Sequence, residues 1–411
     1  MSGFRIFIFA ASRHGVRTNS NQPETALRKV PRRLDGSDLS LPPLKDEAEV
    51  SVFGPGCGEC IVLHLGNNEW VIVDSCVDAE SKRPVALDYL DRVGVDVATK
   101  VSLVVATHWH DDHIGGLAPL FKACKSAKFA CSMALKCEEW TSLVEIYRGY
   151  LQAGGSGVDE LCRVMRELKE RAQKTEVVAP SFCITSRSLL ERRDAVPAKI
   201  ICLAPSDAAV ATMQTRLSRD LLPKAKGRRL RVPDLGENDC SVVLSVTVGN
   251  ASVLLGADLE ERTRPGLGWQ VILDGYPADA ERFAGFKIPH HGSATGHHPE
   301  TWGRLMRPEG WAAVTPFNRQ KEPLPKPEDC ARILAMTENA YITAPPGLSK
   351  FKHREPAVQR TVQEATLAIG VEPGRQGHVR FRRSANVESD GWNVELFGNA
   401  LRLREVLESV S

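Results

Sequence analysis

The sequence contains no long uninterrupted apolar run. Nowhere in its 411 residues is there a stretch approaching the roughly 18 consecutive apolar residues that a membrane-spanning helix needs. We therefore expect no membrane span. The overall hydrophobic content of 42% is nevertheless high enough for a large buried core.

The chain also lacks an excess of charge of either sign. Its formal net charge is +2 with 25% charged residues, which argues against a protein that coats DNA through bulk charge. Contact with phosphates would have to come from a local patch. One candidate is the basic segment "LPKAKGRRLRVP", which contains Lys224, Lys226, Arg228 and Arg229. A solvated charged loop explains this segment equally well.

Cysteine supplies neither a disulfide framework nor a zinc ribbon. The eleven cysteines are odd in number, scattered, and mostly placed inside apolar runs. Cys57 and Cys60 form one CxxC pair, but no second pair follows at the spacing of a structural zinc site. Ordinary strand and turn positions are favoured for this pair, and the cysteine usage as a whole predicts a reducing, cytoplasmic compartment.

Nucleophilic-serine motifs and Gly-rich cofactor loops are missing as well. What the sequence has instead is a dense group of metal-binding side chains in "THWHDDH", directly after the apolar run "SLVVA". His108 and His110 are two residues apart and can face one ion, while Asp112 and His113 can face a second one close by. Imidazole and carboxylate groups are ligands for divalent metals such as zinc, so we favour metal binding over solvated turn residues.

Around this segment, the chain divides into two parts. Residues 1–45 are expected to form a flexible N-terminal extension, because most of this stretch is rich in Arg, Pro, Ser and Asn. Residues 46–411 show short strands, including a hairpin at "GNN", then a helical region over about 118–236, and then further strands. This order predicts an α/β fold with a two-sheet core between helices, and a helical insertion at about 130–175.

The order H-x-H-x-D-H in His108–His113 resembles the signature of the metallo-β-lactamase-fold hydrolases. This resemblance implies a metallo-β-lactamase-like αββα sandwich with a mono- or dinuclear metal site along one edge. The segments "ENDCSVVL", "KIPHHGS", "AAVTPFN", "AYITAPPG" and "GWNVEL" are similar in wording and order to the hydrolase domain of the competence protein ComEC. The similarity covers about residues 48 to 395 and does not include the membrane channel of ComEC.

The resemblance also implies roles for residues outside the histidine segment. Asp74 would orient the histidine loop by hydrogen bonding, as ligating histidines require, and Asp258 in "GAD" would bridge two metals. We expect His291 to bind metal and His290 to lie beside the substrate, although the sequence does not decide between the two. Asp112 and His290 are the expected catalytic residues. The expected substrate contacts are Lys287, Ser293 and Asn318.

Two departures from the family pattern affect this assignment. No histidine lies between His113 and His290, so another residue must complete the site of His108 and His110; the candidates are Asn238 and Asp239. An oxygen ligand would favour manganese more than a site complete in histidine would. In addition, Leu324 stands where related sequences often have a histidine.

Together, these features predict two divalent metal ions, zinc first and manganese as the alternative. A hydroxide bridged by both ions would hydrolyse a phosphodiester, in nucleic acid or a nucleotide, as in a phosphodiesterase or nuclease. One alternative is a thioester, lactam or lactone hydrolase on the same fold. Another is a metal-stabilised, non-enzymatic protein that binds a partner. A protein partner could bind through the N-terminal extension or the helical insertion.

Overall fold

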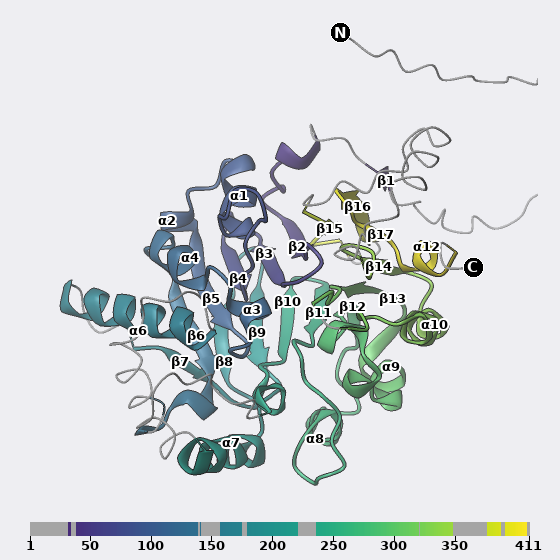
Figure 1. Cartoon of the computed structure of the whole chain (residues 1–411). Helices are drawn as coiled ribbons and strands as arrows, with labels where there is room; N and C mark the ends of the chain where they lie inside the picture. Colours follow the sequence, from purple (N-terminus) through teal and green to yellow (C-terminus); the bar gives the residue numbers. More distant parts are fainter. Residues whose placement is uncertain are drawn as a thin grey trace, which may run out of the picture. The chain divides into compact units, whose positions relative to one another are not determined.

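Two mixed β-sheets dominate the described part of the chain (Figure 1). This computed structural model describes residues 32–33, 38–138, 140, 157–174, 179–220, 236–319, 321–347, 376–387 and 391–408. Within these residues the first sheet has nine strands, in the spatial order β1 (Arg32–Arg33), β16 (Asn393–Phe397), β15 (His378–Ser384), β2 (Glu47–Phe53), β3 (Cys60–Leu65), β4 (Trp70–Val73), β5 (Val101–Ala106), β6 (Lys128–Ser132) and β7 (Ser181–Cys183).

The second sheet has eight strands in the described residues. Their spatial order is β17 (Leu401–Arg402), β14 (Ala340–Ile342), β13 (Met306–Val314), β12 (Phe283–Lys287), β11 (Ala251–Leu255), β10 (Leu244–Val248), β9 (Ala198–Cys202) and β8 (Ser188–Arg192). In both sheets an antiparallel part adjoins a parallel part. The parallel neighbours include β4, β5 and β6 in the first sheet and β11, β12 and β13 in the second.

Helices cover the outer face of each sheet. Those beside the first sheet are α1 (Val85–Arg92), α2 (Val97–Lys100), α3 (Asp111–Ile114), α4 (Leu117–Ala123), α6 (Gly157–Lys174) and α7 (Asp207–Asp220). Those beside the second sheet are α8 (Trp269–Gly275), α9 (Pro299–Leu305), α10 (Pro327–Met336) and α12 (Leu403–Glu408). The 3-10 turns are η1 (Asp38–Ser40), η2 (Met133–Leu135), η3 (Glu237–Cys240), η4 (His290–Gly292) and η5 (Ala294–Gly296).

Strand residues alternate between a central core and two outer cores. In β5, Leu103 and Val105 point into the core between the sheets, whereas Val104 packs against the helices of the outer face. This alternation follows from the two-residue period of a strand, and it requires apolar residues on both faces because both are covered. The four layers confirm the predicted αββα sandwich.

A stacked aromatic pair joins the two sheets. The ring of Trp311 in β13 lies on the ring of Phe381 in β15, with centroids 3.6 Å apart and planes 10° from parallel. Gly285 in the neighbouring β12 makes room for the indole, because a Cβ there would lie 2.2 Å from a Trp311 ring carbon. The glycine is therefore needed for close packing at this point.

Some details differ from the sequence-based expectation. Besides β9, for which "AKIICLAP" predicts a strand, the predicted helical region includes β6, β7 and β8, because short buried strands such as "KFACS" carry no clear two-residue pattern. Part of the predicted insertion at 130–175 lies outside the described residues, as do 1–31 and the basic segment 221–235. The division into extension and domain stays a prediction. None of the described helices is long and apolar enough to cross a membrane, and the eleven cysteines, all of them in the described residues, form no disulfide.

Candidate metal centre

The candidate site lies along the edge where parallel strands of both sheets end. Asp74 follows β4 and His108 lies two residues beyond β5, while Asp258, His291 and Thr315 lie just beyond β11, β12 and β13. The carboxyl ends of parallel strands are the usual place for ligand-binding side chains in α/β folds. The topology therefore brings residues far apart in the sequence to one edge.

Four side chains form the tightest cluster at this edge: Asp112, His113, Asp258 and His291. His113 Nε2 lies 3.3 Å from Asp258 Oδ1 and 3.8 Å from Asp112 Oδ2. His291 Nε2 lies 3.1 Å from Asp112 Oδ2 and 3.4 Å from Asp258 Oδ2. Each residue thus directs one nitrogen or oxygen atom toward a common point.

The spacing of these atoms fits a divalent ion. Ligand atoms about 2.1 Å from a tetrahedral zinc ion lie about 3.4 Å from one another, and the observed nitrogen–oxygen distances run from 3.1 to 3.8 Å. Two of the converging atoms, His113 Nε2 and Asp258 Oδ1, are buried without a hydrogen-bond partner among the described residues. Because buried polar atoms are normally paired, an ion at this point would satisfy both.

A second group, of His108, His110 and Asp258, shares its carboxylate with the first. His108 Nε2 lies 3.1 Å from His110 Nδ1 and 3.9 Å from Asp258 Oδ2. The two groups place His108 and His110 apart from Asp112 and His113, and the binding of one ion by each group stays a prediction. Their common Asp258 suits an arrangement of two ions with one bridging carboxylate, although the role of each ligand stays a prediction.

Hydrogen bonds determine which ring nitrogen of each histidine faces the cluster. His291 donates from Nδ1 to the backbone oxygen of Thr315 at 3.0 Å. His113 donates from Nδ1 to Asp74 Oδ2 at 2.8 Å. In a neutral ring, Nε2 is then the lone-pair nitrogen, which is what metal binding requires.

Asp74 also connects His113 to the start of the histidine segment. Its Oδ1 accepts a hydrogen bond from the Thr107 backbone N–H at 2.7 Å, and its Oδ2 accepts one from Thr107 Oγ1 at 2.7 Å. Since that hydroxyl proton is used, Thr107 Oγ1 accepts from His108 Nδ1 at 3.0 Å. Asp74 adopts a left-handed backbone with φ of 59°, a costly conformation for a residue other than glycine. This geometry agrees with the orienting role expected of Asp74.

The buried acids and histidines shift each other's pKa. Burial alone would lower the pKa of His291, but the carboxylates of Asp258 and Asp112 raise it to about 10. Burial likewise favours a raised pKa for Asp258, yet His113 and His291 hold it well below its usual range. These carboxylates therefore attract positive charge strongly, and a divalent cation would supply that charge in place of protons.

Both carboxylate oxygens of Asp239 already accept hydrogen bonds from arginines. Its Oδ2 accepts a hydrogen bond from Arg216 Nη1 at 2.9 Å, and its Oδ1 accepts one from Arg262 Nε at 2.6 Å. Asn238 differs, because its Oδ1 is buried without a hydrogen-bond partner in the described part of the chain. Its Nδ2 donates to Glu260 Oε1 at 2.7 Å. Asn238 is therefore the better of the two candidates for the site of the first two histidines.

Glu237 is a site residue that the sequence analysis missed. Its Oε2 lies 3.5 Å from His110 Nε2, and its Oε1 accepts a hydrogen bond from Trp109 Nε1 at 3.1 Å. Because His110 directs Nδ1 toward His108, Glu237 contacts the opposite nitrogen and orients the ring. Glu237 directly precedes Asn238, and the 3-10 turn η3 sets the directions of these adjacent side chains.

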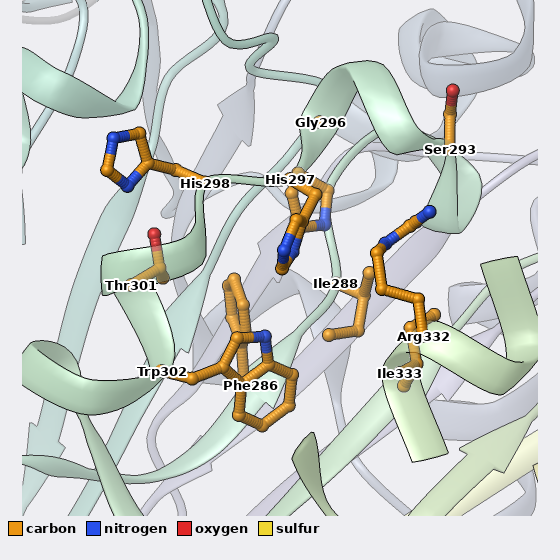
Figure 2. Close-up of a pocket in the computed structure, with 11 residues that line it drawn as sticks. Phe286, Ile288, Ser293, Gly296, His297, His298, Thr301, Trp302, Arg332 and Ile333 are labelled. Atoms are coloured by element: carbon orange, nitrogen blue, oxygen red, sulfur yellow. The ribbon is translucent and has the colours of Figure 1, made fainter. Parts of the chain in front are cut away.

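His290 lies beside the cluster, not in it. Its Nδ1 contacts Thr295 Oγ1 at 2.7 Å, and its Nε2 lies 3.4 Å from Asn238 Nδ2. Ser293, three residues further on, lines a small hollow next to this loop (Figure 2). In Figure 2 Arg332 lies on the same side of the view as Ser293, while Phe286 and Trp302 lie together below them. The described lining contains none of the converging ligand atoms, so the hollow is separate from the cluster.

Burial argues against the expected contact between Lys287 and a substrate. The Lys287 side chain is fully buried, and its Nζ donates to the Ile288 backbone oxygen at 2.9 Å and pairs with Glu59 Oε2 at 2.5 Å. Asn318 is also buried, and its Oδ1 accepts a hydrogen bond from the Gly347 backbone N–H at 2.7 Å. A role of Asn318 in substrate binding stays a prediction.

Comparison with known proteins supports the class that the fold and the cluster define. Residues 54–161 match the family model of the metallo-beta-lactamase superfamily. The matched stretch contains Asp74 and the whole histidine segment. Together with the two mixed sheets and their flanking helices, this match supports the metallo-β-lactamase fold.

Two curated relatives each align over 98 residues at 30% identity. They are the lactamase-like protein ptaB of Pestalotiopsis fici and the atrochrysone carboxyl ACP thioesterase dmxR1 of a Cryptosporiopsis species. The alignments cover 22% of this chain and 31% and 30% of the two relatives, so the chain spans about a third of the length of each.

Two of the similar solved structures have low sequence identity to this chain. The metallo-beta-lactamase fold protein YhfI from Bacillus subtilis shares 13% identity over 65% of this chain and 86% of that protein, with a TM-score of 0.31. Zinc-bound PqqB from Methylobacterium extorquens shares 9% identity over 57% of this chain and 70% of that protein, with a TM-score of 0.28. Because both TM-scores are low, the fold assignment rests on the sheets and the family model.

Proposed function

We propose that this protein is a metal-dependent phosphodiesterase or nuclease with two divalent ions. The observation that carries the proposal is the pair of converging ligand groups that share Asp258. When bound, two such ions supply a nucleophile at neutral pH by lowering the pKa of a coordinated water, and they stabilise the attacking and leaving oxygens of a phosphate.

Different residues of the site would bind the two ions and orient the attacking water. His113 and His291 would hold one ion through Nε2, His108 and His110 would hold the other, and Asp258 would contribute to both. We assign Asp112 as a ligand that also orients the attacking water through its carboxylate. Its Oδ2 lies within 3.1 Å of His291 Nε2.

We assign His290 the role of a hydrogen-bonding partner of the leaving group, which takes its proton from solvent. Burial lowers its pKa, so its ring is neutral at neutral pH and can accept or, through Nδ1–H or Nε2–H, donate a hydrogen bond. It lies at the edge of the cluster, where its ring is half-buried and within reach of solvent.

The choice of a phosphodiester substrate is supported by the oxygen ligands expected at the site of His108 and His110. With Asn238 in place of a third histidine, the site of His108 and His110 would accept manganese as well as zinc. A phosphodiester benefits from two ions because both of its reacting oxygens carry developing charge. The ComEC-like order of motifs supports the same class, and nucleic acid or a nucleotide is the substrate we infer.

A second candidate is thioester hydrolysis. It is favoured by the 30% identity over 98 residues to a protein named as an ACP thioesterase. On this scaffold the same ligands would serve, and the electrophile would be an acyl carbon in place of phosphorus.

A comparison of substrates separates the two reactions. Protein stripped by a chelator would be reloaded with zinc or manganese and assayed on bis(p-nitrophenyl) phosphate, single- and double-stranded DNA, RNA, cyclic nucleotides and a panel of acyl thioesters. We expect metal-dependent cleavage of a phosphodiester. Turnover confined to thioesters would favour the second candidate. No turnover of any substrate, with loss of thermal stability in Asp112→Asn, would instead indicate a structural metal.

A further inference from the structure

We propose that the buried pair of Glu59 and Lys287 positions the two halves of the metal centre relative to each other. Glu59 is hydrogen-bonded both to the backbone of Asp112 and to Thr315, whose backbone oxygen accepts a hydrogen bond from His291. The proposal rests on the metal centre inferred above, but it concerns neither a ligand nor a substrate contact.

The pair joins the two sheets close to His113 of the cluster. Glu59 immediately precedes β3 of the first sheet, and Lys287 is the last residue of β12 in the second. Their side chains are 1% and 0% exposed, with Lys287 Nζ 2.5 Å from Glu59 Oε2. Lys287 Nζ also donates to the backbone oxygen of Ile288, which lies two residues before His290.

Glu59 reaches the metal ligands by two routes. Through its side chain, Oε2 accepts a hydrogen bond from Thr315 Oγ1 at 2.6 Å, and the backbone oxygen of Thr315 accepts one from His291 Nδ1 at 3.0 Å. Through its backbone, the Glu59 N–H donates to the carbonyl oxygen of Asp112 at 2.8 Å. One residue therefore holds a ligand-bearing segment of each sheet.

The carboxylate of Glu59 also faces the inner side of the cluster. Glu59, Asp74 and His113 offer atoms that lie within 4.8 Å of one another, and Glu59 Oε1 is buried without a hydrogen-bond partner among the described residues. Removing two charges from water is unfavourable, and a buried ion pair contributes little net stability compared with apolar side chains. Such a pair can fix the positions of the metal ligands through directional hydrogen bonds, which apolar side chains cannot form.

Three variants test the proposal, with metal affinity as the readout. Metal-free protein would be titrated with zinc in competition with a chelator, and the melting temperature of the metal-free form would be measured in parallel. Lys287→Met leaves Glu59 uncompensated, Thr315→Val removes the hydroxyl bond to Glu59, and Thr315→Ser keeps that bond. We expect the first two to weaken zinc binding by about 10- to 100-fold, as loss of an outer ligand partner does, and Thr315→Ser to bind like wild type.

Arg382→Met is the matched control. Arg382 forms a buried pair with Glu49 in the same sheet as Glu59, with Arg382 Nε 2.7 Å from Glu49 Oε2. Neither residue contacts the cluster in any described interaction. This variant is expected to lower the melting temperature and to leave zinc affinity unchanged. Should Lys287→Met fail to fold, the comparison of Thr315→Val with Thr315→Ser still decides the question.

Wild-type affinity in both Lys287→Met and Thr315→Val, with melting temperatures reduced as in Arg382→Met, would overturn the positioning role. Wild-type protein that binds two ions but cleaves no phosphodiester would contradict the proposed function and leave the positioning role intact. Wild-type protein that retains no ion would overturn both, and the first titration shows this directly.

Discussion

Asp258 Oδ1 lies 3.3 Å from His113 Nε2, and both atoms are buried without a hydrogen-bond partner among the described residues. Asp258 belongs to the second sheet and His113 to the first. This contact brings the two sheets together at the edge where four potential ligand atoms converge. The predictions about the site follow from this convergence.

Asp258→Asn should abolish binding of both ions. Asn has the shape of Asp but lacks the negative charge, and Asp258 is the one residue common to both ligand groups. Loss of a residue that only hydrogen-bonds to a metal ligand typically costs about 10- to 100-fold in activity or affinity. Because Asp258 would itself be a ligand, we expect phosphodiester cleavage to fall by at least about 100-fold. Asp274→Asn, on the exposed face of α8, is the control and should retain wild-type activity. Substantial activity in Asp258→Asn would contradict the bridging role.

Asn238→Ala and Asp239→Asn should differ in metal content. Asn238 Oδ1 is buried without a described partner, whereas the Asp239 carboxylate is held by two arginines. We expect elemental analysis to find about one ion per chain in Asn238→Ala and two in Asp239→Asn, following the ligand count that each site needs. The opposite result would make Asp239 the ligand.

The clustering of the histidine segment was predictable because its histidines are close in sequence. His108, His110 and His113 follow a buried strand, so a single turn brings them together. Asp258 and His291 were found through their motifs and their positions after strands. The sequence could not show which neighbour of Asn238 faces the site, because the turn η3 sets those directions.

The ion pair between the two sheets could not be predicted from the sequence. Lys287 precedes the histidine pair by three residues, which suggested a substrate contact. Its partner Glu59 lies far away in the chain, and only the packing of the sheets brings the two together. Likewise the two-sheet sandwich followed from the strand pattern, whereas short β6, β7 and β8 inside the helical region did not.

Folding stability should fall in acid because of His378. Its ring is buried between Phe53 and Phe397, and burial, followed by Arg380 and Arg382, holds its pKa well below the ordinary 6.5. Below that value the unfolded chain takes up a proton that the folded protein does not, so the free energy of unfolding decreases as pH falls. The expected slope from this residue is at most about 1.4 kcal/mol per pH unit.

His378→Gln removes this titration. Urea unfolding of both proteins between about pH 7.5 and about pH 5.5 should show the stability advantage of wild type over the variant shrinking as the pH is lowered. A constant difference across that range would show that the His378 pKa is not depressed in the folded protein.

The buried pair of Arg382 and Glu49 should matter for stability alone. Glu49 also accepts hydrogen bonds from Ser51 Oγ and Tyr89 OH, so its charge stays buried when the arginine is removed. We expect Arg382→Met to lower the free energy of unfolding by about 3 kcal/mol, and the double variant with Glu49→Gln to recover part of that loss. An unchanged unfolding midpoint in Arg382→Met would contradict this account.

The most direct test of the central claim is anomalous X-ray diffraction from crystals of the protein loaded with zinc or manganese. The account predicts two anomalous peaks on either side of the Asp258 carboxylate. One should lie about 2.1 Å from His113 Nε2 and His291 Nε2, and the other about 2.1 Å from His108 Nε2 and His110 Nδ1. Absence of any peak at this edge, under conditions where the metal is present in excess, would contradict the metal centre.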